Sequence, residues 1–182
     1  PESTSLKWVD DFFAGFNQLA QNTGVRLLGG DTTRSLGPIA VNVSVVGDML
    51  TQNIKRRGAA VPGDILCVTG YLGDAAAGLR ILTENLPAKE EDAALVNQHL
   101  EPRAHLREGQ WLGEQGGVHA MLDLSDGLLS DLPHMLRASG CDGQVDLENL
   151  PHSESLQRAA RTHDWHGEEL ALSGGEDYCL LV

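Results

Sequence analysis

The chain has 182 residues, of which 41% are hydrophobic and 21% charged, so it is long enough for one ordinary domain or two small ones. Its formal net charge of −13 disfavours nucleic acid and anionic membranes as partners, and no stretch is long and apolar enough to cross a bilayer. The three cysteines are widely spaced and form no CxxC pair, which favours a reducing cytoplasm over a disulfide framework or a zinc site.

The first predicted elements are a helix and two strands. Apolar side chains recur at three- and four-residue steps over residues 5–22, which predicts a helix; a hydroxyl residue among 3–5 can cap it and Gly24 can end it. A short strand is predicted over residues 25–28. Residues 38–46 alternate between apolar and small or polar side chains, which is the pattern of a strand with one buried face. The polar loop between these strands suggests a functional site at the strand ends.

Further along the chain, strands alternate with helices. We predict a domain boundary near the basic cluster Lys55-Arg56-Arg57, which divides the chain into residues 1–54 and 55–182. The strands expected beyond it are 65–69, 120–122, 145–147 and 178–182. The helices expected there are 74–86, 90–99, one from Pro102 to the glycines at 116–117, 128–138 and 153–163. This alternation is typical of α/β or α+β layering.

Three polar loops share a composition of small residues and carboxylates. They are Gly29-Gly30-Asp31-Thr32-Thr33, Asp123-Leu124-Ser125-Asp126-Gly127 and Ser173-Gly174-Gly175-Glu176-Asp177. Glycine lets a backbone approach a ligand closely, and exposed N–H groups in such loops can face phosphate oxygens. Mg²⁺ prefers oxygen ligands and usually bridges one or two carboxylates to nucleotide phosphates. Together the loops therefore suggest metal-assisted phosphoryl transfer.

Each loop taken alone has a simpler explanation. Asp-Gly and Gly-Asp pairs are common turn formers, and Asp123 or Asp126 can cap the helix that follows. Arg56 is the cation that we would select for a phosphate contact, although most basic residues on a solvated loop bind nothing specific. The sequence contains neither GxxxxGK[ST] nor GxGxxG, so an ATP enzyme built on it would use neither a P-loop nor a Rossmann fold.

With their flanking residues, the three loops resemble the motifs of thiamine-monophosphate kinases, in the same order. The matching segments are 28–34, 122–128 and 172–178. The intervening segments 62–64, 68–70, 73–79 and 130–132 are also similar to that family. The similarity covers nearly the whole chain, and the motifs are specific as a set although each alone is weak.

The resemblance implies the fold of the aminoimidazole ribonucleotide synthetase-like superfamily, in which ATP and metals bind between two domains. Residues 1–54 would be the C-terminal portion of the N-terminal domain, which serves dimerisation and ATP and Mg²⁺ binding. Residues 55–182 would be most of the C-terminal α/β domain. A homodimer is implied, in which two N-terminal domains join their sheets into a barrel. The implied reaction transfers the ATP γ-phosphoryl group to thiamine monophosphate, giving thiamine diphosphate and ADP, which is the last step of thiamine diphosphate biosynthesis.

The resemblance also implies roles for individual residues. The implied Mg²⁺ ligands are Asp31, Asp123 and Asp126. The implied ATP contacts are Gly30, Asp31, Arg56 and Ser125. Glu176 would contact the thiamine substrate, and no residue is assigned as a general acid or base. Several metal ions would offset the repulsion between a phosphate ester and a triphosphate.

Kinases of this family also have segments without a counterpart here. They have an earlier Gly-Asp-Asp motif, a Ser-Thr-Asp-type metal loop and a later segment with an aromatic substrate contact. We therefore expect both ends of the sequence to be truncated or processed, and these 182 residues alone to have weak or no kinase activity. Two alternatives stay open. One is another ATP-using enzyme of the superfamily, of the selenophosphate synthetase or hydrogenase-maturation type; the other is a non-catalytic fragment that retains dimerisation or ligand binding.

Overall fold

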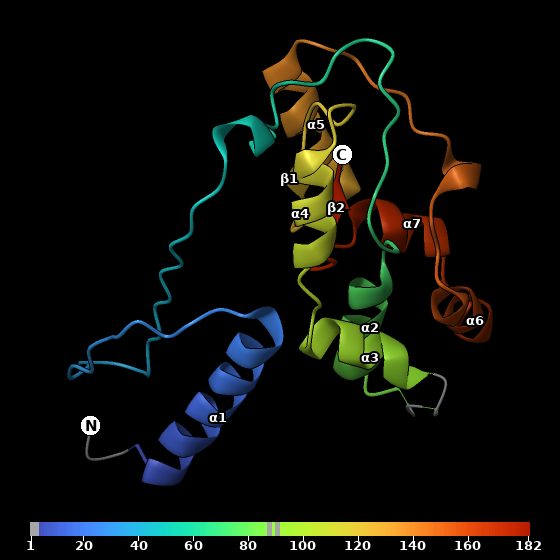
Figure 1. Ribbon diagram of the computed structural model, residues 1–182. Coiled ribbons are helices and arrows are strands. Elements are labelled where there is room, and N and C mark those ends of the chain that lie inside the picture. The colour runs from blue at the N-terminus through green and yellow to red at the C-terminus, as the bar shows by residue number, and fades with distance from the viewer. Residues whose placement is uncertain (1–3, 87–88, 90–91) are drawn as a thin grey trace. The chain divides into compact units, whose positions relative to one another are not determined.

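The computed structural model describes residues 4–86, 89 and 92–182. The chain divides into two units, Pro1–Asp48 and Met49–Val182, and Figure 1 labels the α-helices and β-strands of both. Most of the regular structure is helical, with a small two-stranded sheet, rather than the layered α/β arrangement predicted from the sequence. Within the described ranges, no helix combines the length and the apolar character needed to cross a membrane.

The helix of the first unit, α1 (Leu6–Thr23), forms where it was predicted. Ser5 Oγ accepts a hydrogen bond of 3.1 Å from the Trp8 N–H, and Gly24 ends the helix in the left-handed region at φ 72°. Both ends therefore follow local capping signals. The rings of Trp8 and Phe12 stack along one side of the helix with their centroids 5.5 Å apart.

The two strands predicted for the first unit, at residues 25–28 and 38–46, are not formed. The exposed fractions of Ile39, Val41 and Val43 are 50%, 54% and 58%, so the predicted buried face is exposed. A strand needs a neighbour to satisfy its N–H and C=O groups. In the described part of this unit, residues 25–48 make no backbone hydrogen bond to another segment. The alternation of apolar and polar side chains therefore identifies a segment that could form a strand. The strand itself forms only when a neighbouring segment supplies backbone hydrogen bonds.

The second unit contains the remaining elements. Its described helices are η1 (Thr51–Asn53), α2 (Asp74–Thr83), α3 (Ala93–Leu100), α4 (Leu106–Glu114), α5 (Leu128–Ser139), η3 (Leu147–Asn149), α6 (Glu154–His163) and α7 (Gly167–Ser173). Its strands are β1 (Leu122–Asp123) and β2 (Leu180–Leu181). The helices predicted over 74–86, 128–138 and 153–163 are confirmed as α2, α5 and α6, with small shifts at their ends. Ser153 caps α6 by accepting the Leu156 N–H at 2.9 Å.

Other predicted elements differ from the observed ones. The helix predicted over 90–99 corresponds to α3, and residues 90–91 of that prediction lie outside the described residues. The helix expected from Pro102 begins only at Leu106. The strand predicted over 145–147 is not formed, because this segment leads into the short helix η3. Helix α7 was not predicted, since one short segment beginning with glycine shows too little periodicity to be recognised.

The small sheet brings together segments from both ends of the second unit. β1 pairs antiparallel with β2 in the register Leu122↔Leu181 and Asp123↔Leu180. On the opposite edge of β2, Cys67 and Val182 exchange two backbone hydrogen bonds of 2.9 Å, and the Thr69 N–H donates to the Leu180 carbonyl at 3.0 Å. The strand predicted over 65–69 is therefore present only as a short bridged segment.

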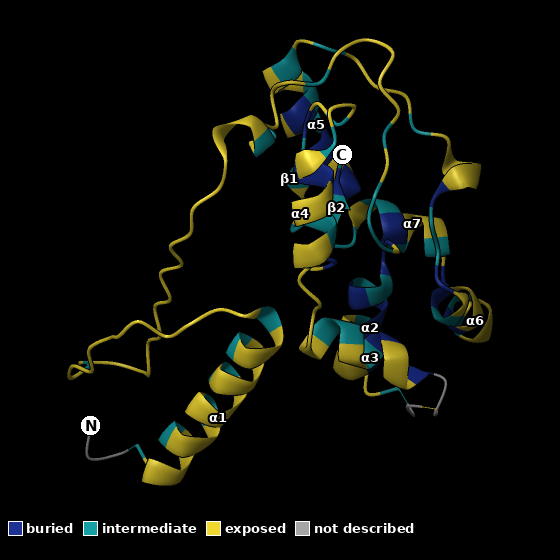
Figure 2. Ribbon diagram, in the orientation of Figure 1, coloured by how far each residue is buried: buried dark blue, intermediate teal, exposed yellow. Residues whose placement is uncertain are grey.

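Two buried apolar clusters support the second unit (Figure 2). One packs α5 against the sheet, and the other joins α2, α3 and α6. In the first cluster Leu124 is 1% exposed, although its neighbours Asp123 and Ser125 are not buried. Leu124 thus anchors the second acidic loop at the edge of the core. The carboxylates of this loop, on Asp123 and Asp126, are exposed to solvent.

Candidate active site

The second and third acidic loops lie side by side because the pairing of β1 with β2 continues into them. The Leu124 N–H donates to the Cys179 carbonyl at 2.9 Å, and the Tyr178 N–H donates to the Leu124 carbonyl at 2.8 Å. The Glu176 N–H then donates to the Ser125 carbonyl, also at 2.8 Å. These bonds join residues that are about fifty positions apart in the sequence, so the two loops form one surface.

Glycines allow the close approach of these loops. A Cβ atom at Gly127 would lie 2.8 Å from the carbonyl oxygen of Gly174, and one at Gly175 would lie 2.7 Å from the carbonyl oxygen of Ser125. Gly127 also has a φ of 98°, which L side chains rarely adopt. Any larger residue at these positions would push the two backbones apart.

The Gly127→Ala variant tests this contact. We expect it to lower the free energy of unfolding by about 2 kcal/mol, because the new Cβ meets backbone atoms and the residue keeps a strained φ. Urea denaturation measures the change. In the matched control Gly117→Ala the Cβ would meet nothing within 4 Å, and we expect a change below about 0.5 kcal/mol. Equal effects in the two variants would contradict the close contact.

Carboxylates gather around the hydroxyl group of Tyr178. This hydroxyl donates a hydrogen bond of 3.2 Å to Glu176 Oε2. The negative charge of Glu176, followed by burial, that hydrogen bond and the charges of Asp123 and Asp126, raises the pKa of Tyr178 above its ordinary value. Glu176 and Tyr178 have left-handed φ values of 70° and 50°. Such conformations in non-glycine residues carry strain and often occur at functional sites.

Asp123 and Asp126 have exposed carboxylates. Such groups are the ligands that a protein usually contributes to a Mg²⁺ ion bound to a nucleotide. In the part of the chain that the structure describes, no three His, Cys, Asp or Glu side chains are arranged to hold a metal ion. Mg²⁺ usually keeps several waters and is bound through one or two carboxylates together with substrate phosphates. Two exposed carboxylates in one loop therefore match the number of protein ligands that such an ion usually takes.

Asp177 connects the third loop to the start of α2. Its side chain is 3% exposed, and its Oδ2 accepts the Gly73 N–H at 2.8 Å while its Oδ1 accepts the Ala75 N–H at 3.4 Å. Burial raises the pKa of the Asp177 carboxyl to about 6, and the nearby charge of Asp74 acts in the same direction. Asp177 belongs to the third loop motif, although the sequence alone indicates no role for it. Its place in the third loop motif, directly after Glu176, was the available signal in the sequence.

Asp131 is a second site residue for which the sequence alone indicates no role. It lies in the first turn of α5 and is 6% exposed. Its Oδ2 accepts the backbone N–H groups of Ser125 and Asp126. Only its place in a segment resembling the kinase family signalled its importance, since the hydrogen-bond partners of a buried carboxylate depend on the fold.

The remaining predicted site residues lie elsewhere in the chain. Gly30 and Asp31 are exposed residues of the first unit, where the Thr32 N–H donates to Asp31 Oδ1 at 2.8 Å. Arg56 belongs to the second unit and is exposed in a turn, with its carbonyl accepting the Ala59 N–H at 3.3 Å. The structure therefore groups the predicted residues of the second and third loops, while those of the first loop belong to the other unit.

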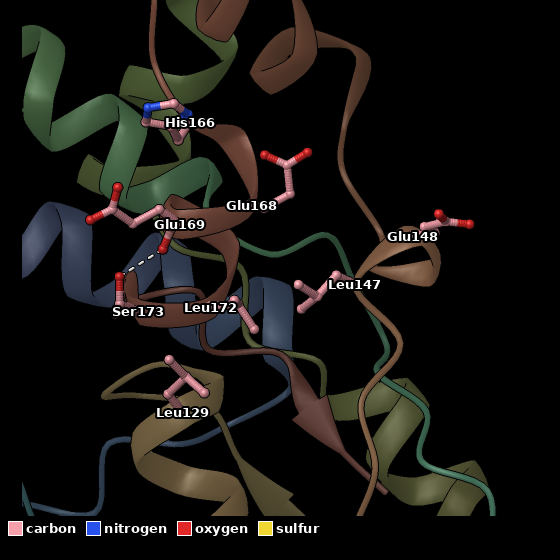
Figure 3. Close-up of a pocket in the computed structure, with 8 residues that line it drawn as sticks. All are labelled: Leu129, Leu147, Glu148, His166, Glu168, Glu169, Leu172 and Ser173. Carbon is pink, nitrogen blue, oxygen red and sulfur yellow. Dashed lines mark hydrogen bonds between the residues drawn. The ribbon is translucent and has the colours of Figure 1, made fainter.

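An open groove of about 570 Å³ adjoins the third loop (Figure 3). Its lining combines three leucines with acidic and polar groups, namely Leu129, Leu147, Leu172, Glu148, Glu168, Glu169, His166 and Ser173. Ser173 Oγ donates to the Glu169 carbonyl at 2.6 Å and so ties the end of α7 to its preceding turn. None of the site residues predicted from the sequence lines this groove. The groove is therefore distinct from the surface that carries Asp123, Asp126 and Glu176.

Comparisons with known proteins support the same family as the motifs. Residues 61–181 match the family described as AIR synthase related protein, C-terminal domain. The thiamine-monophosphate kinase of Salmonella typhimurium is 40% identical over 179 residues, which cover 96% of this chain and 53% of that protein. This chain spans about half the length of the curated relatives that it matches.

Two solved structures have the same fold. One is described as AaThiL complexed with AMPPCP and TMP; it superposes with a TM-score of 0.85 at 27% identity and covers 100% of this chain and 57% of that one. The other is a thiamine-monophosphate kinase from Stenotrophomonas maltophilia, with a TM-score of 0.81 at 32% identity over 98% of this chain and 57% of that one. The resemblance inferred from the loop motifs is thereby confirmed. The chain belongs to the AIR synthase related family and is homologous to the thiamine-monophosphate kinases.

Proposed function

We propose that the protein containing this chain transfers the γ-phosphoryl group of ATP to thiamine monophosphate in a Mg²⁺-dependent reaction, giving thiamine diphosphate and ADP. The curated relatives are thiamine-monophosphate kinases, and one structural neighbour holds AMPPCP, an analogue of ATP, together with TMP. Phosphoryl transfer of this kind depends mainly on positioning the reactants and neutralising their charge. The acidic loops are suited to that task.

The observation that carries the proposal is the hydrogen-bonded pairing of the second loop with the third. Because the Glu176 N–H donates to the Ser125 carbonyl, Asp123, Asp126 and Glu176 share one surface. In the proposed complex Asp123 and Asp126 bind Mg²⁺, which would neutralise phosphate charge. The Ser125 hydroxyl contacts ATP. Glu176 contacts the substrate, where its negative charge complements the cationic thiazolium ring of thiamine.

The proposal also gives roles to Gly30 and Asp31 of the first unit and to Arg56 of the second. Asp31 would supply a further Mg²⁺ ligand, and Gly30, Asp31 and Arg56 would contact ATP. In this proposal residues 1–54 form the C-terminal portion of an N-terminal domain, and residues 55–182 form most of a C-terminal domain. This is the two-domain architecture of the aminoimidazole ribonucleotide synthetase-like superfamily. The protein would act as a homodimer in the cytoplasm, where ATP and Mg²⁺ are available. These features follow the family resemblance of the loop motifs.

A kinase assay tests the proposal directly. The complete natural polypeptide is incubated with ATP, Mg²⁺ and thiamine monophosphate, and thiamine diphosphate is detected by chromatography after oxidation to its fluorescent thiochrome. We expect one ADP for each thiamine diphosphate and no product when Mg²⁺ is chelated. Selenide serves as the control acceptor. ATP consumption that depends on selenide, without formation of thiamine diphosphate, would assign the protein to a different enzyme of the superfamily.

A further inference from the structure

The carboxylate of Asp131 is directed at the loop before its helix rather than at the helix itself. Its Oδ2 accepts the Ser125 N–H at 3.0 Å and the Asp126 N–H at 2.9 Å. Both donors precede Gly127, whereas an ordinary capping carboxylate bonds the first N–H groups of its own helix. In return, the Gly127 carbonyl accepts the N–H groups of Ser130 and Asp131. The loop and the first turn of α5 are therefore closed on each other by reciprocal bonds.

These bonds restrict the backbone that carries the exposed Asp126 carboxylate and that follows Asp123 at the end of β1. The N–H of Ser125 is bonded to Asp131 and its carbonyl accepts the Glu176 N–H, so both backbone polar groups of Ser125 are occupied. The N–H of Asp126 is occupied by Asp131 as well. The N–H groups of Ser125 and Asp126 consequently face the interior and are engaged there. The loop presents its carboxylates, rather than these N–H groups, to a ligand.

The charge of Asp131 is compatible with its burial. Two N–H donors bind a single carboxylate oxygen, and the first turn of α5 places the group near the positive end of the helix dipole. A buried acceptor of this kind keeps its partners in one arrangement, because breaking the bonds would leave buried polar groups without partners. It therefore has the position of a group that orients metal ligands without touching the metal.

We propose that Asp131 is a positioning residue of this site, whose Oδ2 sets the direction in which the Asp126 carboxylate meets a divalent cation that Asp123 also binds. This inference rests on the proposed function, in which those two carboxylates bind Mg²⁺. The hydrogen bonds of Asp131 carry the effect. An asparagine in its place keeps an oxygen that can accept both N–H groups, whereas an alanine keeps none.

The test measures the affinity of the complete natural polypeptide for Mn²⁺ by electron paramagnetic resonance, in the presence of AMPPCP. We expect Asp131→Ala to weaken Mn²⁺ binding by about tenfold or more, the usual consequence of losing a group that orients metal ligands. Asp131→Asn should stay within about threefold of the wild type. Thermal melting checks that each variant is folded. Should Asp131→Ala not fold, Asp131→Glu provides the same test, because it keeps the charge but displaces the acceptor by one methylene group.

Asp92→Ala is the matched control. Asp92 is also a buried carboxylate, 2% exposed, that accepts a backbone N–H near the start of a helix, here from Lys89 at 3.1 Å. This variant should lower the melting temperature and leave Mn²⁺ affinity unchanged. Wild-type affinity in Asp131→Ala, or equal weakening in Asp131→Ala and Asp131→Asn, would overturn the inference. Asp131-dependent Mn²⁺ binding in a protein that does not phosphorylate thiamine monophosphate would instead refute only the proposed function.

Discussion

Replacing Asp126 with asparagine is expected to lower kcat for thiamine diphosphate formation by about a hundredfold or more, with little change in stability. A metal ion contributes several kcal/mol of charge stabilisation in the transition state, and losing about 3 kcal/mol of it corresponds to a hundredfold in rate. The Asp126 side chain is exposed, and its N–H keeps the bond to Asp131 in the variant. The loop should therefore keep its conformation, while the proposed Mg²⁺ site would lose a charged ligand.

Steady-state kinetics at several Mg²⁺ concentrations, together with urea denaturation, measures both effects. Asp142→Asn is the matched control, because it makes the same change at an exposed aspartate in another loop of the second unit. We expect this control to retain wild-type turnover and both variants to unfold within about 0.5 kcal/mol of the wild type. If Asp126→Asn kept full turnover at every Mg²⁺ concentration, Asp126 would not be a metal ligand.

The second large effect concerns pH and arises from Asp177. Burial raises the pKa of this carboxyl from 3.8 to about 6, so the folded state holds the proton more tightly than the unfolded state. The resulting stability is fully present below about pH 4 and is lost as the pH rises to about 6. A difference of two pKa units corresponds to about 3 kcal/mol. We therefore expect Asp177 to make the wild-type protein less stable at pH 7 than at pH 4 by an amount of that order.

The Asp177→Asn variant isolates this contribution. Its amide does not ionise, and its oxygen can still accept the Gly73 N–H. Urea denaturation between pH 4 and pH 7 gives the free energy of unfolding of both proteins, and the difference between them removes the effects of other groups. Asp74, whose pKa is also raised by burial, is present in both proteins. We expect the stability of the wild type relative to the variant to fall by about 3 kcal/mol over this range. If the difference in free energy of unfolding between the two proteins stayed constant from pH 4 to pH 7, Asp177 would not titrate in this range.

Local signals were sufficient to predict several elements of the fold. The start of α1 at Ser5, its end at Gly24 and the cap of α6 at Ser153 depend on residues within one turn of each other. The strand predicted over 38–46 shows the limit of such signals. Its alternation is clear, yet a strand exists only where another segment supplies hydrogen bonds, and the described residues of the first unit supply none.

The amino-acid sequence by itself identified three acidic glycine loops, their order and their resemblance to the thiamine-monophosphate kinases, because motif residues are close neighbours along the chain. It did not reveal that the second and third loops pair through Ser125 and Glu176, or that Asp131 and Asp177 anchor them from within. Those relations became visible only in the folded chain. Non-local hydrogen bonds join residues that no local pattern connects, and a buried carboxylate acquires its partners and its pKa from the packing around it.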